Sequence, residues 1–143
     1  MMAVVVDASV AVKWCLPAQD EQLVSEAEEL LASYRARDIA FLVPDLFWLE
    51  LANALWKAVR KRKIDRNGVE RGYSLVTDLG IPTIPSFDLV PKALDLAVIH
   101  DRTVYDSVYV VLASQYKTNL ITADERLANA LAARFPVKWL GAF

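Results

Sequence analysis

The sequence predicts an α/β protein: a three-layer α/β/α sandwich with a mainly parallel sheet of roughly five strands. Short runs of β-branched and other apolar residues alternate with longer segments whose apolar residues recur at helical spacing. This alternation is typical of parallel strands joined by helical crossovers, which cover both faces of the sheet. The length of 143 residues is that of one domain, so we treat 1–143 as a single unit.

The strands are predicted from short apolar runs that end at turn residues or charges. The run 39–43 closes at Pro44 and Asp45. Pro82 interrupts a later run and favours an edge strand, because proline cannot donate a ladder hydrogen bond. The predicted strands cover residues 4–7, 39–43, 81–84, 119–122 and 137–140.

The helices are predicted where apolar residues return every three or four positions. Pro17 stops the first helix, and Asp45 is placed at the N-cap of the strongest one, which runs to about Lys63. Asn67-Gly68 is expected to break the helical pattern before it resumes. The predicted helices cover residues 8–16, 21–37, 45–63, 69–79, 89–99, 104–116 and 124–134.

Composition narrows the class of protein. Asp7 and Lys13 interrupt the most apolar stretch, which falls short of the roughly 18 apolar residues of a membrane helix. The N-terminus lacks the basic region of a secretion signal, and the single Cys15 cannot form an intrachain disulfide, so we expect a cytoplasmic protein. The mean hydropathy of +0.27 is high, and we expect part of the apolar surface to cover an interface. The core or an interface, rather than base stacking, is also expected for Trp14, Trp48, Trp56 and Trp139.

Four acidic residues stand in apolar surroundings: Asp7, Glu50, Asp106 and Asp124. An isolated carboxylate there must be neutralised, paired or bound to metal, because desolvating a bare charge is costly. Asp7 and Asp124 follow predicted strands, whereas Glu50 and Asp106 lie near the starts of predicted helices. The carboxyl ends of parallel strands share one edge, where open α/β sheets bind ligands. We therefore expect all four carboxylates to reach the same edge.

Each acidic residue also has a structural explanation. Asp7 and Asp124 are placed to cap the helices that follow them, and a cap still points its carboxylate at the sheet edge. Asp106 is placed to cap a helix or to pair with Arg102. Glu50 is at no helix start and has no nearby cation. Four separate explanations are less economical than one shared site.

The inventory of side chains indicates which chemistry such a site performs. His100 is the only histidine, which excludes a two-histidine metal site within one chain. Two carboxylates about 5 Å apart repel by roughly 3 kcal/mol at an effective dielectric near 20, so a cluster of four calls for cations. An all-oxygen site suits Mg²⁺ or Mn²⁺. One or two such cations relieve the repulsion and leave open positions for water and phosphate.

A basic segment follows Glu50 along the chain. Residues 57–71 contain seven basic and two acidic residues, which gives this window a charge of +5 within a chain of net charge -2. A local cationic strip can follow a phosphate backbone, although a solvated helix end is an equally simple explanation. Arg102 and Arg126 are further candidates to neutralise phosphate. The candidate RNA-binding residues in the segment are Lys57, Arg60, Lys61, Arg62 and Lys63.

Four motifs in this order resemble the PIN domain, and among PIN domains the VapC-type toxin ribonucleases. They are VVDAS (5–9), LELAN (49–53), YDSVY (105–109) and LITADERL (120–127), and together they cover essentially the whole chain. The resemblance implies a Mg²⁺- or Mn²⁺-dependent ribonuclease that forms a homodimer and binds a cognate VapB-like antitoxin. It implies that Asp7, Glu50, Asp106 and Asp124 bind the metal, with Ser9 and Thr122 hydrogen-bonded to the site.

Two other functions remain open at this point. A PIN-like domain can serve only in dimerisation and partner binding, although the four acidic residues argue for catalysis. An aspartate-based phosphotransfer domain is less favoured. Ser9 stands where a dehalogenase-type pattern has a second aspartate, and the paired acid and late lysine of a receiver domain are not convincing.

Overall fold

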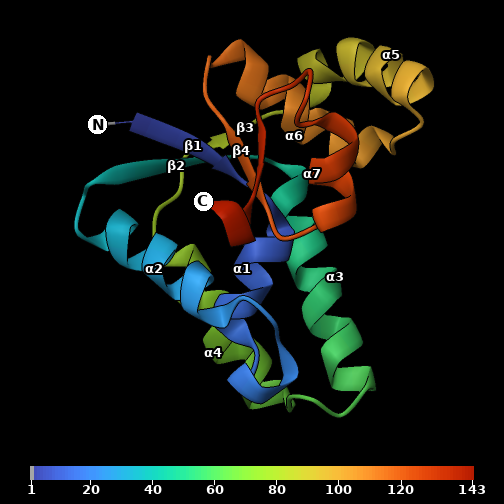
Figure 1. The fold of residues 1–143 in the computed structure, drawn as a ribbon. Coiled ribbons are helices and arrows are strands. Elements are labelled where there is room, and N and C mark those ends of the chain that lie inside the picture. Colours follow the sequence, from blue (N-terminus) through green and yellow to red (C-terminus); the bar gives the residue numbers. More distant parts are fainter. Residues whose placement is uncertain (1) are drawn as a thin grey trace.

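The computed structural model describes residues 2–143, and its centre is a five-stranded sheet in which all strands run parallel (Figure 1). The strand order is β3-β2-β1-β4-β5. The chain therefore builds β2 and β3 on one side of β1, and β4 and β5 on the other. The ends of β1 and β4 form the switch point at which such sheets bind ligands. The strands are β1 (Met2–Val6), β2 (Ile39–Pro44), β3 (Thr83–Ile84), β4 (Leu120–Thr122) and β5 (Val137–Trp139).

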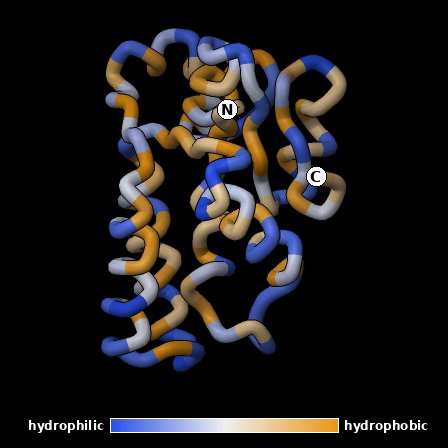
Figure 2. Tube along the Cα trace, turned by 90° about the vertical axis from the view of Figure 1, so that its left-hand side faces the viewer, coloured by the Kyte–Doolittle hydropathy of each residue, from blue (hydrophilic) through white to orange (hydrophobic). Residues whose placement is uncertain are grey.

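Seven α-helices within residues 2–143 cover the sheet and complete the predicted three-layer sandwich, which the structure confirms. As right-handed crossovers require, α1 packs against α2, α3 and α4, whereas α6 packs against α5 and against β1 and β2. Figure 2 shows hydrophobic and hydrophilic residues alternating along the helices, as expected for elements with one face on the core. The helices are α1 (Ala8–Cys15), α2 (Val24–Arg35), α3 (Leu46–Arg60), α4 (Arg66–Thr77), α5 (Val90–His100), α6 (Val104–Gln115) and α7 (Glu125–Leu131).

The expected break at Asn67-Gly68 is wrong, because both residues lie in the first turn of α4. The side chain of Asp65 caps this helix by accepting a hydrogen bond from the Gly68 amide at 2.7 Å. A Cβ atom at Gly68 would lie 2.4 Å from Ile64 Cγ1, so this glycine permits close packing. The break falls earlier instead: α3 ends at Arg60, and the left-handed backbone of Arg62 (φ 57°) turns the chain.

Other boundaries also differ from the prediction. The residues after Pro17 form a short 3₁₀ helix, η1 (Ala18–Asp20), and α2 therefore starts later than expected. Asp45 stands at the N-cap of α3 but does not cap it. Its carboxylate accepts hydrogen bonds from the Ser86 hydroxyl at 2.6 Å and the Ser86 amide at 3.2 Å, which ties β2 to the segment after β3.

The core is formed by the strands and by the inner faces of the helices. Trp14, Trp48 and Trp139 pack against it, as predicted. Trp56 does not: it is 52% exposed on α3. No helix within the described part of the chain is both long and apolar enough to cross a bilayer.

Candidate active site

Asp7 lies where β1 ends and α1 begins, and it is the most buried of the four acidic residues, with 8% of its surface exposed. Its Oδ2 accepts hydrogen bonds from Ser9 Oγ at 2.8 Å and from Thr122 Oγ1 at 2.7 Å. Its side chain makes no capping bond to α1, so the capping alternative is wrong here. No side chain within residues 2–143 donates a hydrogen bond to Oδ1, although a backbone hydrogen bond from Ser9 lowers the pKa of this carboxyl group.

Ser9 and Thr122 join the two strand ends that flank the site. Each hydroxyl has one proton, which it donates to Asp7, so the contact of 3.4 Å between the two hydroxyl oxygens is not a further bond. Ser9 Oγ instead accepts from the Ala123 amide at 3.1 Å, and Thr122 Oγ1 accepts from the Asp124 amide at 3.0 Å. Each hydroxyl thus uses its proton and one of its two lone pairs, and together they fix the β1–α1 junction against the β4–α7 junction.

Glu50 is held by a residue that sequence reasoning did not assign to the site. Tyr109, which is 1% exposed on α6, donates a hydrogen bond from Oη to Glu50 Oε1 at 2.7 Å. Burial raises the pKa of Tyr109 strongly, and the charges of Asp7 and Glu50 raise it further, so the phenol stays a donor. The spacing in the sequence could have assigned Tyr109 to the site, because it follows Asp106 by three residues and thus lies on the same side of the helix.

The two remaining acidic residues lie at helix starts. Thr103 is the N-cap of α6, and its Oγ1 accepts from the Asp106 amide at 3.0 Å, so Asp106 lies inside the first turn. Asp106 does not cap a helix, so that alternative is wrong. It forms no close ion pair with Arg102 among the described residues, but the charge of Arg102 lowers the pKa of Asp106. Asp124 does cap α7: its Oδ1 accepts from the Leu127 amide at 3.1 Å.

Electrostatic interactions link the four carboxylates. Burial raises the pKa of Asp7, and the charge of Asp106 adds to that effect against the hydrogen bonds from Thr122 and Ser9. Burial, with the charges of Asp7 and Asp106, raises the pKa of Glu50 to about 7. Burial also raises the pKa of Asp106, and the charge of Asp124 contributes. The charges of Asp7, Glu50 and Asp106 thus interact. Asp124 is exposed, and its charge affects the group by raising the pKa of Asp106.

The donor atoms fit a hard divalent cation. None of the four acidic residues forms an ion pair within residues 2–143, so no lysine or arginine neutralises the cluster directly. In the same part of the chain, no three acidic, histidine or cysteine side chains are already arranged around one point. Mg²⁺ needs no such cage, because it keeps several waters and is commonly held by one or two carboxylates. Asp7 Oδ1 and Glu50 Oε2 accept no hydrogen bond from another side chain, so each is a candidate metal ligand of that kind.

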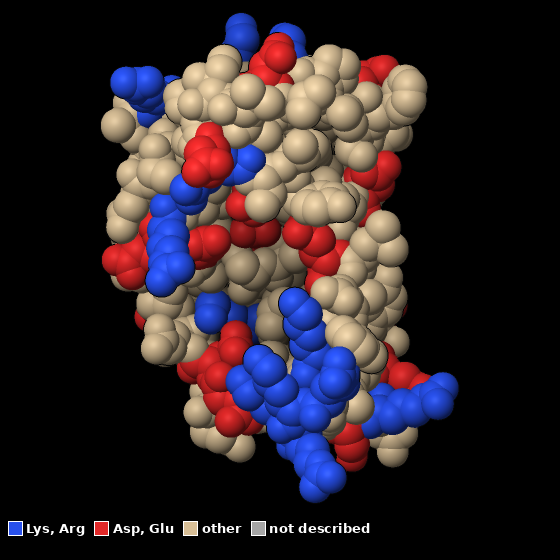
Figure 3. All heavy atoms as spheres, turned by 90° about the vertical axis from the view of Figure 1, so that its right-hand side faces the viewer, with Lys and Arg blue, Asp and Glu red and all other residues tan. Residues whose placement is uncertain are grey.

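The surface around the site carries opposite charges in separate places. Figure 3 shows acidic atoms around a hollow in the middle of one face and a dense cluster of basic atoms below it. In Figure 1, α3 descends from the sheet edge to that lower end of the molecule. The basic cluster at the end of α3 consists of Lys57, Arg60, Lys61, Arg62 and Lys63.

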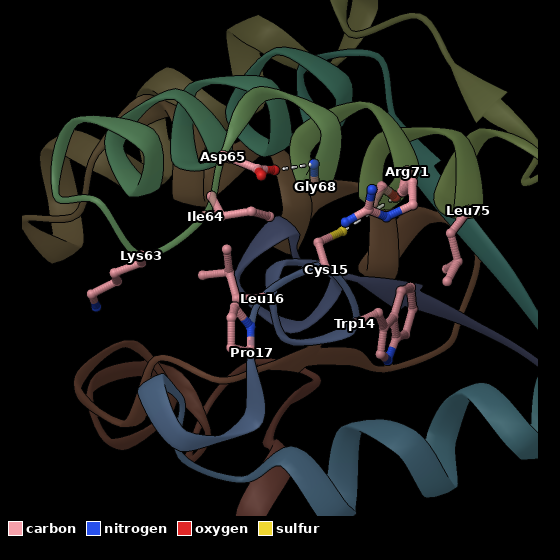
Figure 4. A pocket seen from close by; sticks show the side chains of 11 residues that line it. Trp14, Cys15, Leu16, Pro17, Lys63, Ile64, Asp65, Gly68, Arg71 and Leu75 are labelled. Carbon is pink, nitrogen blue, oxygen red and sulfur yellow. Dashed lines mark hydrogen bonds between the residues drawn. The ribbon is translucent and has the colours of Figure 1, made fainter.

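A separate pocket of about 470 Å³ lies between the end of α1 and α4 and contains none of the four acidic residues (Figure 4). Cys15 lines it, and its Sγ donates weak hydrogen bonds to the carbonyls of Ala11 at 3.5 Å and Gly72 at 3.4 Å. Burial raises the pKa of this thiol to about 11, which keeps it protonated and unreactive. His100 lies elsewhere, at the end of α5, with its ring edge-on to Phe135. Neither residue belongs to the carboxylate site.

Comparison with known proteins agrees with this architecture. Residues 4–131 match the sequence profile of the PIN domain. The chain is 31% identical over 140 residues to Ribonuclease VapC3 of Pyrobaculum aerophilum, an alignment that covers 92% of this chain and 97% of that protein. The crystal structure of PAE2754 from the same organism superposes with a TM-score of 0.71 at 21% identity, covering 98% of this chain and 85% of the other. VapC20 of Mycobacterium tuberculosis, a toxin that cleaves the sarcin-ricin loop, superposes with a TM-score of 0.68 at 16% identity and coverages of 92% and 95%.

Proposed function

The chain belongs to the PIN domain family, and from that membership and the carboxylate site we propose that it is a metal-dependent ribonuclease that hydrolyses RNA phosphodiester bonds. The observation that carries the proposal is the group Asp7, Glu50 and Asp106. Beyond the effect of burial, the charge of Asp106 raises the pKa of Asp7, and the charges of Asp7 and Asp106 raise the pKa of Glu50, while none of the three forms an ion pair among the described residues. The likeness to Ribonuclease VapC3 supports RNA as the substrate and a role as the toxin of a VapBC-type pair.

Each residue of the site has a distinct task in this proposal. Asp7 offers Oδ1 to a cation because Ser9 and Thr122 hold its other oxygen, and Glu50 offers one oxygen because Tyr109 holds the other. Asp106 and Asp124 extend the negative charge toward the exposed side, where a phosphate enters. The chemistry that a bound Mg²⁺ or Mn²⁺ supplies is activation of water and neutralisation of charge on phosphate. The ionised carboxylates orient the attacking water through hydrogen bonds.

We extend the proposal to the partners of the protein. A VapB-like antitoxin and a homodimer are the assemblies that VapC-type membership implies. Support for a protein interface comes from the surface of α5 and of η2 (Phe87–Leu89), where Phe87, Val90, Leu94 and Val98 form an exposed apolar stripe at helical spacing. Action on cellular RNA would place the protein in the cytoplasm. Light scattering that gave a monomer mass at micromolar concentration would exclude the homodimer.

Replacing Asp7 or Asp106 by Asn tests the enzymatic proposal. Each change keeps the shape of the side chain and removes one charge, so we expect cleavage of single-stranded RNA with Mn²⁺ to fall by at least about a hundredfold. The matched control is Asp88→Asn, which changes an exposed aspartate in η2 and should leave cleavage unchanged. Because burial penalises both site charges, the two site variants should melt no lower than the wild type. Wild-type rates in Asp7→Asn or Asp106→Asn would refute the assignment and favour the non-catalytic module.

A further inference from the structure

One face of α3 connects the acidic site to the basic cluster. Glu50, Asn53, Lys57 and Lys61 recur at helical spacing and therefore lie along the same side of the helix. At a rise of 1.5 Å per residue, Lys57 and Lys61 follow Glu50 by roughly 10 Å and roughly 16 Å along the axis. Because the helix descends from the acidic hollow toward the basic end of the same face, a bound chain can contact both (Figures 1 and 3).

The basic cluster is not neutralised by the protein itself. The ion pairs found within residues 2–143 involve Lys13 with Glu21 and Arg66 with Glu70, and neither includes a member of the cluster. A helix C-terminus favours positive charge only within its last turn. Five cations between residues 57 and 63 exceed what this effect requires, and they repel one another. A polyanion is the ligand whose chemistry matches an unneutralised strip of this kind.

An exposed aromatic residue lies beside these cations. Trp56 is 52% exposed, and the guanidinium of Arg60 is 5.1 Å from the centroid of its ring. Trp56 follows Glu50 by six residues, which places it roughly 9 Å along the helix axis and about 120° around the helix from the line of Glu50, Asn53 and Lys57, on the side of Arg60. Aromatic rings that stack on bases next to cations that contact phosphates are the combination by which proteins bind single-stranded nucleic acid.

We propose that α3 is a binding track for single-stranded RNA, in which Trp56 stacks on a base while Lys57, Lys61 and Arg62 contact backbone phosphates. The track rests on the proposed ribonuclease function, and it adds a length requirement for the substrate. About 16 Å corresponds to about five nucleotides at the stacked rise of about 3.4 Å per strand, and to fewer in an extended strand. An RNA therefore needs several nucleotides on one side of the scissile bond to reach Lys61.

Binding in EDTA, which prevents metal-dependent cleavage, tests the track directly. Fluorescence anisotropy would compare labelled oligouridylates of about 4 and about 12 nucleotides, lengths that fall on either side of the predicted footprint. We expect Trp56→Ala to weaken binding of the longer RNA roughly tenfold, and Trp56→Phe to restore most of the affinity. The double variant Lys57→Ala/Lys61→Ala should lower the slope of log K against log salt by about 1.4. The shorter RNA spans less than the distance from Glu50 to Lys61, so we expect the wild type to bind it more weakly than the longer RNA.

Matched controls lie outside the track. Tyr116→Ala removes an aromatic ring that is 51% exposed, and Lys92→Ala removes an exposed cation on α5; both should bind RNA like the wild type. The proposal is overturned if the track variants bind the longer RNA with wild-type affinity and salt slope. It is also overturned if Trp56→Ala only dissociates a dimer, since the residue then belongs to an interface between copies.

Cleavage of a long RNA by the wild type with Mn²⁺ separates this proposal from the enzymatic one. If the wild type cleaves RNA and the track variants retain its affinity and rate, the track fails and the ribonuclease function stands. If the wild type cleaves no RNA but binds it through Trp56 and Lys61, the track stands and the enzymatic proposal fails. Oligonucleotides lengthened only at the 5′ end or only at the 3′ end then show which side of the scissile bond α3 contacts.

Discussion

Asp7 has two differently occupied oxygens, and this asymmetry determines what the residue can do. Two hydroxyl donors hold Oδ2, which fixes the rotamer, whereas no side chain within residues 2–143 donates to Oδ1. Glu50 repeats the arrangement, with Tyr109 on Oε1. Fixed carboxylates with one free oxygen suit cation binding, because little side-chain entropy is lost when the ligand arrives.

Replacing Tyr109 by Phe tests the role of that hydrogen bond. The bond lowers the pKa of Glu50 against the effects of burial and of Asp7 and Asp106. Without it, the pKa of Glu50 rises further above about 7, and less of the residue is ionised at neutral pH. We expect kcat/KM at about pH 7 to fall roughly tenfold, with partial recovery at about pH 8.5, since one pKa unit corresponds to a factor of ten. The measurement is the pH–rate profile for RNA cleavage with Mn²⁺.

Tyr116→Phe is the matched control, because this hydroxyl lies on an exposed residue just after α6. Its profile should overlay that of the wild type. If Tyr109→Phe lowers the rate equally at every pH, the tyrosine supports the fold or packing and does not set the ionisation of Glu50.

At the scale of elements, two helix starts deliver carboxylates to the sheet edge in different ways. Thr103 caps α6, which leaves Asp106 free within the first turn. Asp124 itself caps α7, which is a structural role. Its charge also raises the pKa of Asp106, which is a candidate electrostatic role in the site. Both side chains are near a helix N-terminus, where the backbone dipole also favours negative charge.

Two substitutions at Asp124 separate these tasks. Asn is as good an N-cap as Asp, so Asp124→Asn should keep the free energy of unfolding within about 0.5 kcal/mol of the wild type. Asp124→Ala should lose about 1 kcal/mol in urea denaturation. If the charge contributes to catalysis, both variants lose RNA cleavage to a similar extent. Full activity in Asp124→Asn would restrict the residue to capping.

Much of the element order followed from sequence alone, for physical reasons. Apolar runs that end at a charge mark the strands, and parallel strands must present their carboxyl ends at one edge. That placed Asp7 and Asp124 near each other without coordinates. The double hydrogen bond to Asp7 was not predictable in detail, because it depends on the register that pairs Val6 with Ile121 and on the rotamers of Ser9 and Thr122.

The errors have a common cause, which is a local preference overridden by a tertiary contact. Asn67-Gly68 has strong turn propensity, but the Asp65 cap and the close packing of Gly68 against Ile64 place it in a helix. Asp45 has the chemistry of a cap, yet Ser86, 41 residues away, takes its carboxylate.

At the scale of the whole molecule, charge is separated more strongly than the net value of -2 suggests. Acidic side chains surround the hollow and cations gather at the far end of α3 (Figure 3). A phosphate backbone is therefore attracted to one end of this face and repelled at the other until cations occupy the acidic site. If the protein binds RNA and cations as proposed, this architecture makes the two binding events depend on each other.

The cation-free protein should lose stability as pH rises, and divalent cations should reverse the loss. Glu50 has a pKa of about 7 in the folded protein against an ordinary value of 4.5. Between these values the folded state holds a proton that the unfolded chain has released, so raising the pH lowers the free energy of unfolding. The raised pKa values of Asp7 and Asp106 act in the same direction. Glu50→Gln should flatten this dependence in thermal melts with EDTA.

In the proposed metal site, Mg²⁺ or Mn²⁺ would compete with those protons for the same oxygens, so its stabilising effect should grow with pH. At a concentration of about 100 Kd the gain is about 2.7 kcal/mol, which for a chain of this size raises Tm by roughly 5 to 10 °C. We expect that shift at about pH 8, a much smaller one at about pH 5.5, and little at either pH in Asp106→Asn. Equal shifts at both pH values, or an undiminished shift in Asp106→Asn, would mean that the cation binds away from these carboxylates.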